Sequence, residues 1–530
     1  MEGREVTSTS RIAVINTGGT ISCVGTPLSP MTAAQFAEAF QRIVEPILVE
    51  QYPDVTFDCI TDLHFPESKS GTLDSTNLQP SDWCLISGRI LEDYVDYDAW
   101  IVLHGTDSMA YTAGALPFLL SSFDADGTGQ IVQDKPVVLT GSQVPLFFQA
   151  TPDEPLTLRF NTDAYQNVCA AVAMALTGVP EVTVAFRGKI MRGARVLKVS
   201  ANNDDAFHSP NLAPLAIIGI DFAVDEDAVL AGPQSPQVAL SNPDVLARAR
   251  DRMNYIAGRI NDCPVVPVPA VPARFTSDGP AFIAKVVDAI VATGAKGLVL
   301  ESYGEGNFPS GYPDSASDGT IAKALAAATA AGVVIADGTQ VLSGTVNATA
   351  YASGAWLPEA GAIGIRDMTP ISAITKLIVL LAEEGWSGNG WDADAVRRLL
   401  PQSLLGEALV DDRIDADSRS SLLPSQTLRS SGGSATLAVD AEYGLALRDA
   451  GGKLLWSSHP DGVSQTPVRA RATPAGVVLT GRDGSVLWEA GTGENGASGA
   501  SGLALRERNG TTLVLTSATG EVVGTLYDGR

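Results

Sequence analysis

The chain has 530 residues, 45% of them hydrophobic and 18% charged, and its formal net charge is −25. This length exceeds that of one ordinary core, so we expect about two to four domains. The acidic balance argues against nucleic acid or an anionic membrane as the main partner. No apolar run is long enough to predict a transmembrane helix.

The N-terminus lacks the basic and apolar regions of a signal peptide, so we expect a cytoplasmic protein. The five cysteines are widely spread and none belongs to a CxxC pair, which favours free thiols in a reducing compartment. None of the four histidines stands at metal-ligand spacing to another histidine or cysteine, so we expect no metal site.

The first part of the chain alternates short apolar runs with longer helical patterns, which predicts a parallel α/β sheet. The expected strands are Arg11–Asn16, Trp100–Leu103, Pro136–Leu139 and Glu181–Phe186, and the expected helices are Thr32–Glu50, Pro80–Asp96 and Asn161–Leu176. A small polar loop with glycine follows each of the first three strands: TGGT, HGTDS and TGSQ. Because ligands bind at the carboxyl ends of such strands, we expect these loops to share one pocket.

An irregular segment follows, from Asn211 to Pro272, with one expected helix at Pro243–Ile260. It ends in the proline-rich CPVVPVPAVPARF, which is typical of a linker or of a strand that crosses between domains. A second α/β unit is expected from Phe275 to Glu384, with strands at Gly297–Glu301 and Gly332–Ala336 and a helix at Ser372–Glu384.

From Ser421 onward the composition changes to short alternating strands with glycine-rich turns. Three segments resemble one another: YGLALRDAGGKLLWSS, GVVLTGRDGSVLWEAG and GLALRERNGTTLVLTS. Such repeats predict a small all-β module with pseudo-threefold symmetry.

Four motifs carry candidate chemistry, and each has an ordinary structural explanation when it is taken alone. A strand followed by Thr17-Gly18-Gly19-Thr20 is weak evidence, because glycine-rich loops after a first strand usually bind phosphate. The HGTDS loop and the Asp74–Asn77 cluster both resemble helix caps. A single lysine such as Lys198 is normally a solvated surface charge.

The combination is more specific than its parts. TGGTI, a DST loop, HGTD and a downstream lysine, in this order on an α/β chain, resemble the bacterial-type L-asparaginase family. KPVVLTGSQVPL, ESYGEGNFP, DGTQVLSGTVNATAYASG and IRDMTPISAITKLIVLLAE look like its cytosolic, type I branch. The resemblance covers about Ile12 to Glu384, with an insertion around Val224–Arg259. It implies a larger N-terminal parallel-sheet domain and a smaller C-terminal α/β domain.

The resemblance also implies catalytic roles. Thr17 matches the nucleophilic threonine, and Thr106, Asp107 and Lys198 match its supporting triad. A threonine hydroxyl needs an adjacent base, and Lys198 would relay protons in that role. Backbone N–H groups of the glycine-rich loops would stabilise the oxyanion. No metal or organic cofactor is implied.

The substrate implied by the resemblance is free L-asparagine. Asp74 and Ser75 match the loop that holds its α-ammonium and α-carboxylate groups, and Thr106 and Asp107 contact it as well. Asn307 matches a residue that reaches toward a neighbouring subunit's site, which implies a homodimer or homotetramer.

One family feature is missing from the chain. Family members carry a tyrosine on a lid shortly after TGGTI, and here the stretch reads SCVGTPLSPMTAAQF. Either another group, for which Tyr303 is a candidate, takes its place, or the lid works differently.

The C-terminal module resembles the bulb-type (monocot mannose-binding) lectins, whose fold is a β-prism. That family binds mannose through Q-x-D-x-N-x-V-x-Y, and the matching positions here are Asp440, Glu442, Gly444, Ala446 and Arg448. The sugar-binding set is therefore absent, and we do not expect glycan binding. We expect Trp456 and Trp488 to be core residues and the module to serve assembly or partner contact.

The sequence thus predicts a two-domain α/β asparaginase followed by a β-prism-like domain, divided at residues 1–215, 216–272 (linker with the insertion helix), 273–400 and 421–530. The expected reaction is hydrolysis of L-asparagine. Alternatives are a glutaminase-asparaginase, the amidase subunit of a tRNA-dependent amidotransferase, or an inactive asparaginase-fold sensor or scaffold. The early position of TGGTI and the acidic charge disfavour the amidotransferase.

Overall fold

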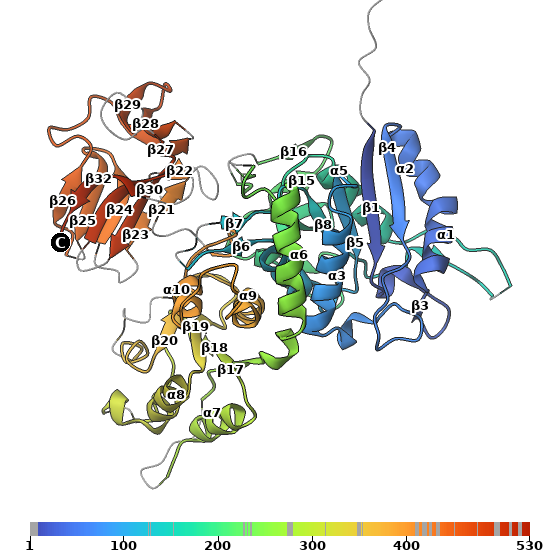
Figure 1. The fold of residues 1–530 in the computed structure, drawn as a ribbon, viewed down its shortest axis with the longest axis horizontal. Coiled ribbons are helices and arrows are strands. Elements are labelled where there is room, and N and C mark those ends of the chain that lie inside the picture. Colours follow the sequence, from blue (N-terminus) through green and yellow to red (C-terminus); the bar gives the residue numbers. More distant parts are fainter. Residues whose placement is uncertain are drawn as a thin grey trace, which may run out of the picture. The chain divides into compact units, whose positions relative to one another are not determined.

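The computed structural model describes residues 9–125, 127, 129–151, 153–225, 228–230, 232–233, 236–272, 279–312, 314–346, 351, 353–408, 413–415, 421–422, 424, 427–430, 435–449, 451–473, 475–491, 499–507, 511–517 and 522–530. The chain divides into two compact units (Figure 1). We call Met1–Val224 with Gln237–Gln402 the body, and Asp225–Pro236 with Ser403–Arg530 the β module. No helix in the described part of the chain is long and apolar enough to cross a membrane.

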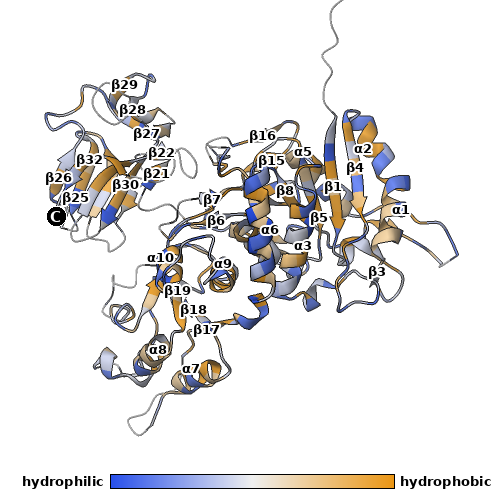
Figure 2. Cartoon of the chain, viewed as in Figure 1, coloured by the Kyte–Doolittle hydropathy of each residue, from blue (hydrophilic) through white to orange (hydrophobic). Residues whose placement is uncertain are grey.

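An eight-stranded sheet forms the larger part of the body. Its order is β16 (Phe222–Val224), β15 (Ala216–Ile218), β12 (Lys189–Arg192), β11 (Val182–Phe186), β8 (Val137–Thr140), β5 (Ala99–Leu103), β1 (Ser10–Asn16) and β4 (Val55–Ile60). The five strands from β11 to β4 are parallel, and they include all four strands expected from the sequence. Figure 2 shows β1 as hydrophobic along most of its length, as a strand buried between helical layers must be.

The predicted parallel sheet continues at one edge into antiparallel strands, which the sequence pattern did not indicate. Strand β12 returns antiparallel to β11 through a two-residue turn, and β15 and β16 continue antiparallel. The two turn residues, Arg187 and Gly188, have φ of 49° and 70°. Positive φ at both central positions is the geometry of a tight hairpin turn, so the chain reverses here without a crossover helix.

Helices of this domain are α1 (Ala33–Ile43), α2 (Glu45–Gln51), α3 (Pro80–Glu92), α4 (Met109–Leu120), α5 (Ala164–Ala175) and α6 (Pro243–Ala257). The single helix expected at Thr32–Glu50 is two helices, because Pro46 lacks a backbone N–H and starts a new first turn. Helix α6, the insertion helix, packs against α3 (Figure 1). Its buried Arg252 is paired with Glu383.

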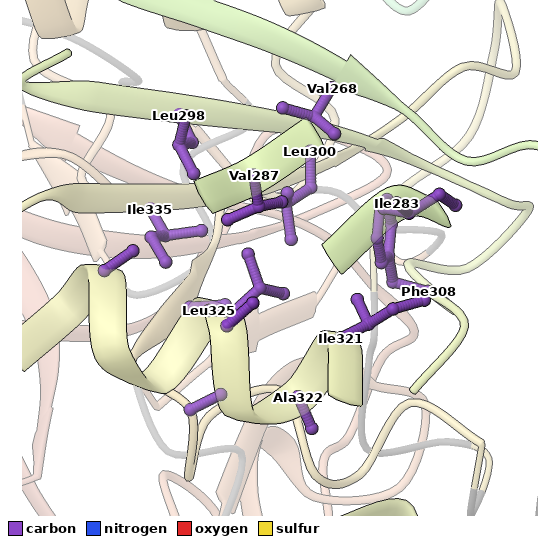
Figure 3. Close-up of a cluster of buried hydrophobic side chains, with 14 of the residues drawn as sticks. Val268, Ile283, Val287, Leu298, Leu300, Phe308, Ile321, Ala322, Leu325 and Ile335 are labelled. Atoms are coloured by element: carbon purple, nitrogen blue, oxygen red, sulfur yellow. The ribbon is translucent and has the colours of Figure 1, made fainter. Parts of the chain in front are cut away.

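A second, parallel sheet has the order β17 (Val265–Pro269), β18 (Gly297–Ser302), β19 (Val334–Thr339) and β20 (Ala362–Gly364). The proline-rich segment is therefore the edge strand β17, a position in which a missing backbone donor is tolerated. The accompanying helices are α7 (Phe282–Ala292), α8 (Thr320–Ala330), α9 (Pro370–Glu383) and α10 (Ala395–Leu399). Figure 3 shows the core between this sheet and α7 and α8, where Leu298, Leu300 and Ile335 meet Val287 and Leu325.

Short antiparallel hairpins complete the body. They are β2 (Cys23–Val24) with β3 (Ser29–Pro30), β6 (Ser122–Phe123) with β7 (Gly129–Ile131), β9 (Phe147–Phe148) with β10 (Thr157–Leu158), and β13 (Leu197–Lys198) with β14 (Phe207–His208).

The β module consists of three four-stranded antiparallel sheets. Their orders are β23 (Thr427–Arg429), β24 (Ala435–Asp440), β25 (Gly444–Asp449), β26 (Leu454–Ser457); β22 (Ser421–Leu422), β27 (Pro467–Thr473), β28 (Gly476–Gly481), β29 (Val486–Ala490); and β21 (Arg413–Asp415), β30 (Gly502–Glu507), β31 (Thr511–Thr516), β32 (Val522–Asp528). Leucines from all three sheets form one core, and Trp456 and Trp488 pack against it. The two tryptophan rings contact each other edge to face.

The third repeat is displaced by one strand from the expected match. A β-bulge marks the last hairpin of each sheet, after Leu447, Leu479 and Leu515, and the third hairpin has another after Leu513. Leu515 is the equivalent residue, because it pairs nine residues further on, with Gly524, as Leu447 does with Trp456 and Leu479 with Trp488. By this mark β31 is the equivalent of β25 and β28, whereas sequence similarity had matched β30 to them. Gly524 then occupies the position of Trp456 and Trp488, because it pairs with Leu515 as they pair with Leu447 and Leu479.

Candidate active site

The TGGT loop is clamped between two other segments. Gly19 N–H donates to Leu73 O at 3.1 Å, and Leu73 N–H donates to Thr17 O at 2.8 Å. A Cβ on Gly18 would lie 2.1 Å from Leu73 O, and one on Gly19 would lie 2.2 Å from the Cα of Gly105. Both glycines also have positive φ, so the loop closes this tightly only because no side chain is present.

The segment Asp74–Asn77 and the HGTDS loop meet at the same place. Ser108 Oγ donates to Ser75 O at 2.6 Å. A Cβ on Gly105 would lie 2.5 Å from Ser75 Oγ. The TGGT loop, the segment Asp74–Asn77 and the HGTDS loop are thus in direct contact, although they are far apart in the sequence.

Lys198 reaches this cluster from the β13–β14 hairpin. Its Nζ donates to Thr106 Oγ1 at 2.9 Å and to Asp107 Oδ1 at 2.6 Å. The Asp107 side chain is 56% exposed and that of Lys198 21%, so the carboxylate faces solvent while the ammonium is largely covered. The structure therefore brings these three predicted residues together in one hydrogen-bonded group.

Thr17 lies at the end of β1 and is 1% exposed. Its hydroxyl donates to Leu103 O at 3.0 Å. The acceptor is a neutral carbonyl and not a base, so this hydrogen bond orients the hydroxyl without activating it.

The other predicted site residues fall into two groups. Ser75 lies in the cluster, and Asp74 next to it accepts from the N–H and hydroxyl of Thr76, both at 3.1 Å. Asn307 and Tyr303 lie apart, in the loop after β18. There Tyr303 N–H donates to Asn307 O at 3.0 Å, and Ser353 Oγ donates to Asn307 Oδ1 at 3.2 Å.

Two residues around the TGGT loop were not identified from the sequence. Asn16 Oδ1 accepts from Gly18 N–H at 3.1 Å. Cys23 donates its thiol proton to Gly19 O at 3.1 Å. Burial, with the charge of Asp74, raises the pKa of Cys23 to about 11, so this thiol does not replace the missing lid tyrosine as a base. The one signal in the sequence that could have identified Asn16 is its position as a polar residue at the end of an apolar strand.

Two family models match most of the chain. The family model described as asparaginase, N-terminal, matches residues 11–230, and that described as glutaminase/asparaginase C-terminal domain matches residues 279–399. L-asparaginase 1 of Escherichia coli K12 is 31% identical over 402 residues, which are 76% of this chain and 98% of that protein. The chain belongs to the asparaginase family.

Solved structures of this family share the fold. The L-asparaginase of Thermococcus kodakarensis and L-asparaginase I of Vibrio cholerae O1 each align with a TM-score of 0.53 at 26% identity. Each alignment covers 75% of this chain and 99% of the other. The second family model ends at residue 399, so the Ser403–Arg530 part of the β module lies beyond the residues that the two models match.

Proposed function

We propose that this asparaginase-family chain hydrolyses the side-chain amide of L-asparagine to L-aspartate and ammonia. The observation that carries the proposal is the position of Lys198 Nζ between Thr106 Oγ1 and Asp107 Oδ1, at 2.9 and 2.6 Å. A lysine that contacts both a hydroxyl and a carboxylate is the arrangement that a proton relay requires.

In the proposed reaction, Thr17 Oγ attacks the carboxamide carbon of the substrate. As the C–O bond forms, the hydroxyl proton passes by way of Thr106 to Lys198, which must be an uncharged amine at that moment to accept it. The amide nitrogen takes a proton, the C–N bond breaks, and ammonia leaves an acyl ester on Thr17. Water hydrolyses that ester, which releases aspartate and restores the hydroxyl.

The substrate is a zwitterion, so its two charged ends need separate partners. We assign its α-ammonium to Asp107, whose carboxylate is more than half exposed, and to Asp74. We assign its α-carboxylate to the hydroxyl and N–H of Ser75, the residue that follows Asp74 in the same loop. Asn307 acts in this scheme from a neighbouring subunit of a homodimer or homotetramer.

For the β module we propose a β-prism of the bulb-lectin type without its sugar site. The three sheets around one core support this architecture. Asp440 and Arg448 stand at two positions where the lectins have sugar-binding residues, and here Arg448 donates a hydrogen bond to Asp440 at 3.0 Å. We further propose the domain limits 1–215, 216–272, 273–400 and 421–530, and a cytoplasmic location.

Two other functions are distinguished by experiment. Activity on L-glutamine equal to that on L-asparagine would indicate a glutaminase-asparaginase. The only feature that favours an inactive sensor or scaffold is the missing lid tyrosine. In the stretch where family members carry that tyrosine, the exposed residues between β2 and β3 include Leu28.

The test is ammonia release from L-asparagine and L-glutamine by the purified chain and by Thr17→Ala. The matched control is Thr56→Ala, whose hydroxyl also donates to a backbone carbonyl, that of Ser10. We expect asparagine hydrolysis in the wild type and the control and a loss of about 10³-fold or more in Thr17→Ala. Wild-type rates in Thr17→Ala would refute the proposed nucleophile, and no release from any folded variant would refute the enzyme.

A further inference from the structure

His104, the first residue of the HGTDS loop, has no role in the mechanism above, although it lies next to the residues that carry out the reaction. The imidazole is completely buried. Its Nδ1 lies 2.7 Å from Gly105 O, and its Nε2 lies 2.9 Å from Thr112 Oγ1 in the first turn of α4. Both ring nitrogens are therefore bonded, one to the catalytic loop and one to the helix that follows it.

These two contacts determine the tautomer. A carbonyl oxygen only accepts hydrogen bonds, so Nδ1 must carry the proton that it shares with Gly105 O. Burial lowers the pKa of His104 to about 4, against a smaller opposite effect of the Gly105 hydrogen bond. The ring is then neutral at physiological pH, its Nε2 is bare, and the Thr112 hydroxyl donates to it.

The carbonyl of Gly105 belongs to the same peptide group as the N–H of Thr106. Because a trans peptide is planar, the C=O and N–H point in opposite directions. Holding Gly105 O toward the buried ring turns Thr106 N–H to the other side of the loop. In the described part of the chain this N–H makes no hydrogen bond, and its own side chain carries the hydroxyl that Lys198 contacts.

We infer that His104 is a positioning residue, which acts through the Gly105–Thr106 peptide to aim Thr106 N–H at the substrate amide oxygen as an oxyanion donor. A backbone N–H without a partner, beside a hydroxyl of the proton relay, can stabilise the oxyanion of a tetrahedral intermediate. The inference rests on the proposed hydrolysis, and it adds a residue that touches neither substrate nor proton relay.

The kinetic test compares His104→Phe with His104→Asn. Phenylalanine fills the cavity without a donor, whereas asparagine places an N–H near the former Nδ1. We expect His104→Phe to lower kcat for L-asparagine by about 10- to 10³-fold, as loss or misdirection of one oxyanion donor does. KM and inhibition by L-aspartate should change less than about threefold, because the groups that hold the charged ends are untouched. His104→Asn should regain most of the lost kcat.

A milder variant and a matched control guard against misfolding. Thr112→Val keeps the shape of the side chain but frees Nε2, and we expect a severalfold loss of kcat with unchanged KM. His459→Phe in the β module removes another imidazole–carbonyl bond, Nε2 to Leu487 O at 3.0 Å, and should leave kcat unchanged. Wild-type kcat in His104→Phe, or equal losses of kcat and L-aspartate affinity, would overturn the positioning role.

A readout independent of activity separates this inference from the proposed function. In a spectrum of ¹⁵N-histidine-labelled protein, which has only four histidines, His104 should show a protonated Nδ1 and a bare Nε2 from pH 5 to 9. A ring that titrates in this range, or carries its proton on Nε2, overturns the inference even if the enzyme is active. Absence of ammonia release by the wild type overturns the proposed function, and the role of His104 in catalysis with it.

Discussion

The body and the β module each present an acidic side chain hydrogen-bonded to a basic one, in strand-end or hairpin segments where a ligand site is expected. In the body, Asp107 accepts from Lys198 at 2.6 Å, and in the module Asp440 accepts from Arg448 at 3.0 Å. The two pairs look alike in isolation, and they differ in what else each carboxylate contacts.

Asp440 is satisfied by its own turn. It accepts from the N–H groups of Glu442 and Tyr443 at 2.8 and 3.0 Å, in addition to Arg448. Burial raises the pKa of Asp440, but these three hydrogen bonds outweigh it and the pKa is lowered. Its oxygens are thus occupied from within the module.

Asp107 keeps most of its surface open, and the cation that holds it also holds a hydroxyl. A working site leaves hydrogen-bonding capacity for a ligand, whereas a site that has lost its ligand tends to fill with internal partners. An ion pair therefore indicates a functional site only when its carboxylate can still form hydrogen bonds with a ligand.

The largest expected effect is that of Lys198→Met. If this lysine relays the proton, kcat for L-asparagine falls by about 10²- to 10⁴-fold, while the melting temperature changes little because Asp107 remains solvated. Steady-state kinetics with a thermal melt of the same sample measures both. A drop smaller than threefold would show that Lys198 and Arg448 are equally structural.

The variant Asp107→Asn tests whether the exposed carboxylate of Asp107 binds the substrate ammonium. The amide still accepts a hydrogen bond from Lys198 but no longer neutralises the substrate ammonium. We expect KM for L-asparagine to rise about 10- to 100-fold, the usual value of a hydrogen bond to a charged group. An unchanged KM, with kcat alone reduced, would move Asp107 from substrate binding to the relay.

A third carboxyl, Asp337, sharpens the comparison because it forms no ion pair among the described residues. It is 1% exposed, and among the described residues only Ser302 donates to its carboxyl group, at 2.5 Å. Burial raises the pKa of Asp337 to about 7, although the hydrogen bond from Ser302 opposes the shift.

The consequence of this raised pKa is a loss of stability with rising pH. Below the unfolded-state pKa, 3.8, the carboxyl is protonated in both states. Between that value and about 7 only the unfolded chain ionises, so stability falls until the folded carboxyl titrates as well. Relative to wild type, Asp337→Asn should gain about 2 kcal/mol of stability between pH 5 and pH 8. Urea unfolding at both pH values measures this, and parallel shifts of the two proteins would contradict the expectation.

The smallest effect is expected from Arg448→Met. Its partly exposed pair contributes at most about 1 kcal/mol, and Asp440 retains its two backbone donors. Urea unfolding of the full chain should therefore show a shift within that limit, and asparagine hydrolysis should be unchanged. Mannose binding by this variant, measured by calorimetry, would contradict the assignment of a lost sugar site.

The sequence was most informative for features that depend on residues close together in the chain. The strand at Arg11–Asn16 was predicted because an uninterrupted apolar run suits a strand covered on both faces, and β1 confirms it. The break of the first helix at Pro46 was also readable in principle, since proline disfavours a helix interior. The hairpin between β11 and β12 was missed because its turn, Arg187-Gly188, lies inside an otherwise regular α/β pattern.

The third repeat of the β module shows why local similarity fails. Alternating apolar and polar residues have a period of two, so short strands of different sheet positions resemble one another closely. Only the bulge after Leu515 and the pairing of that residue with Gly524 identify β31 as the equivalent of β25 and β28 in the other two sheets.

By itself, the sequence determined the strands, the glycines of the TGGT loop and the identity of the polar residues that follow each strand, because these depend on neighbours along the chain. The family resemblance implied that Lys198 and Thr106 act together, but only the tertiary structure shows the contact between them, 92 positions apart, and the His104 ring turned toward Gly105 O. These contacts are made between loops brought together by sheet order and side-chain packing, and no local pattern specifies them. The chemistry of the site was therefore legible in the residue types, but its geometry was not.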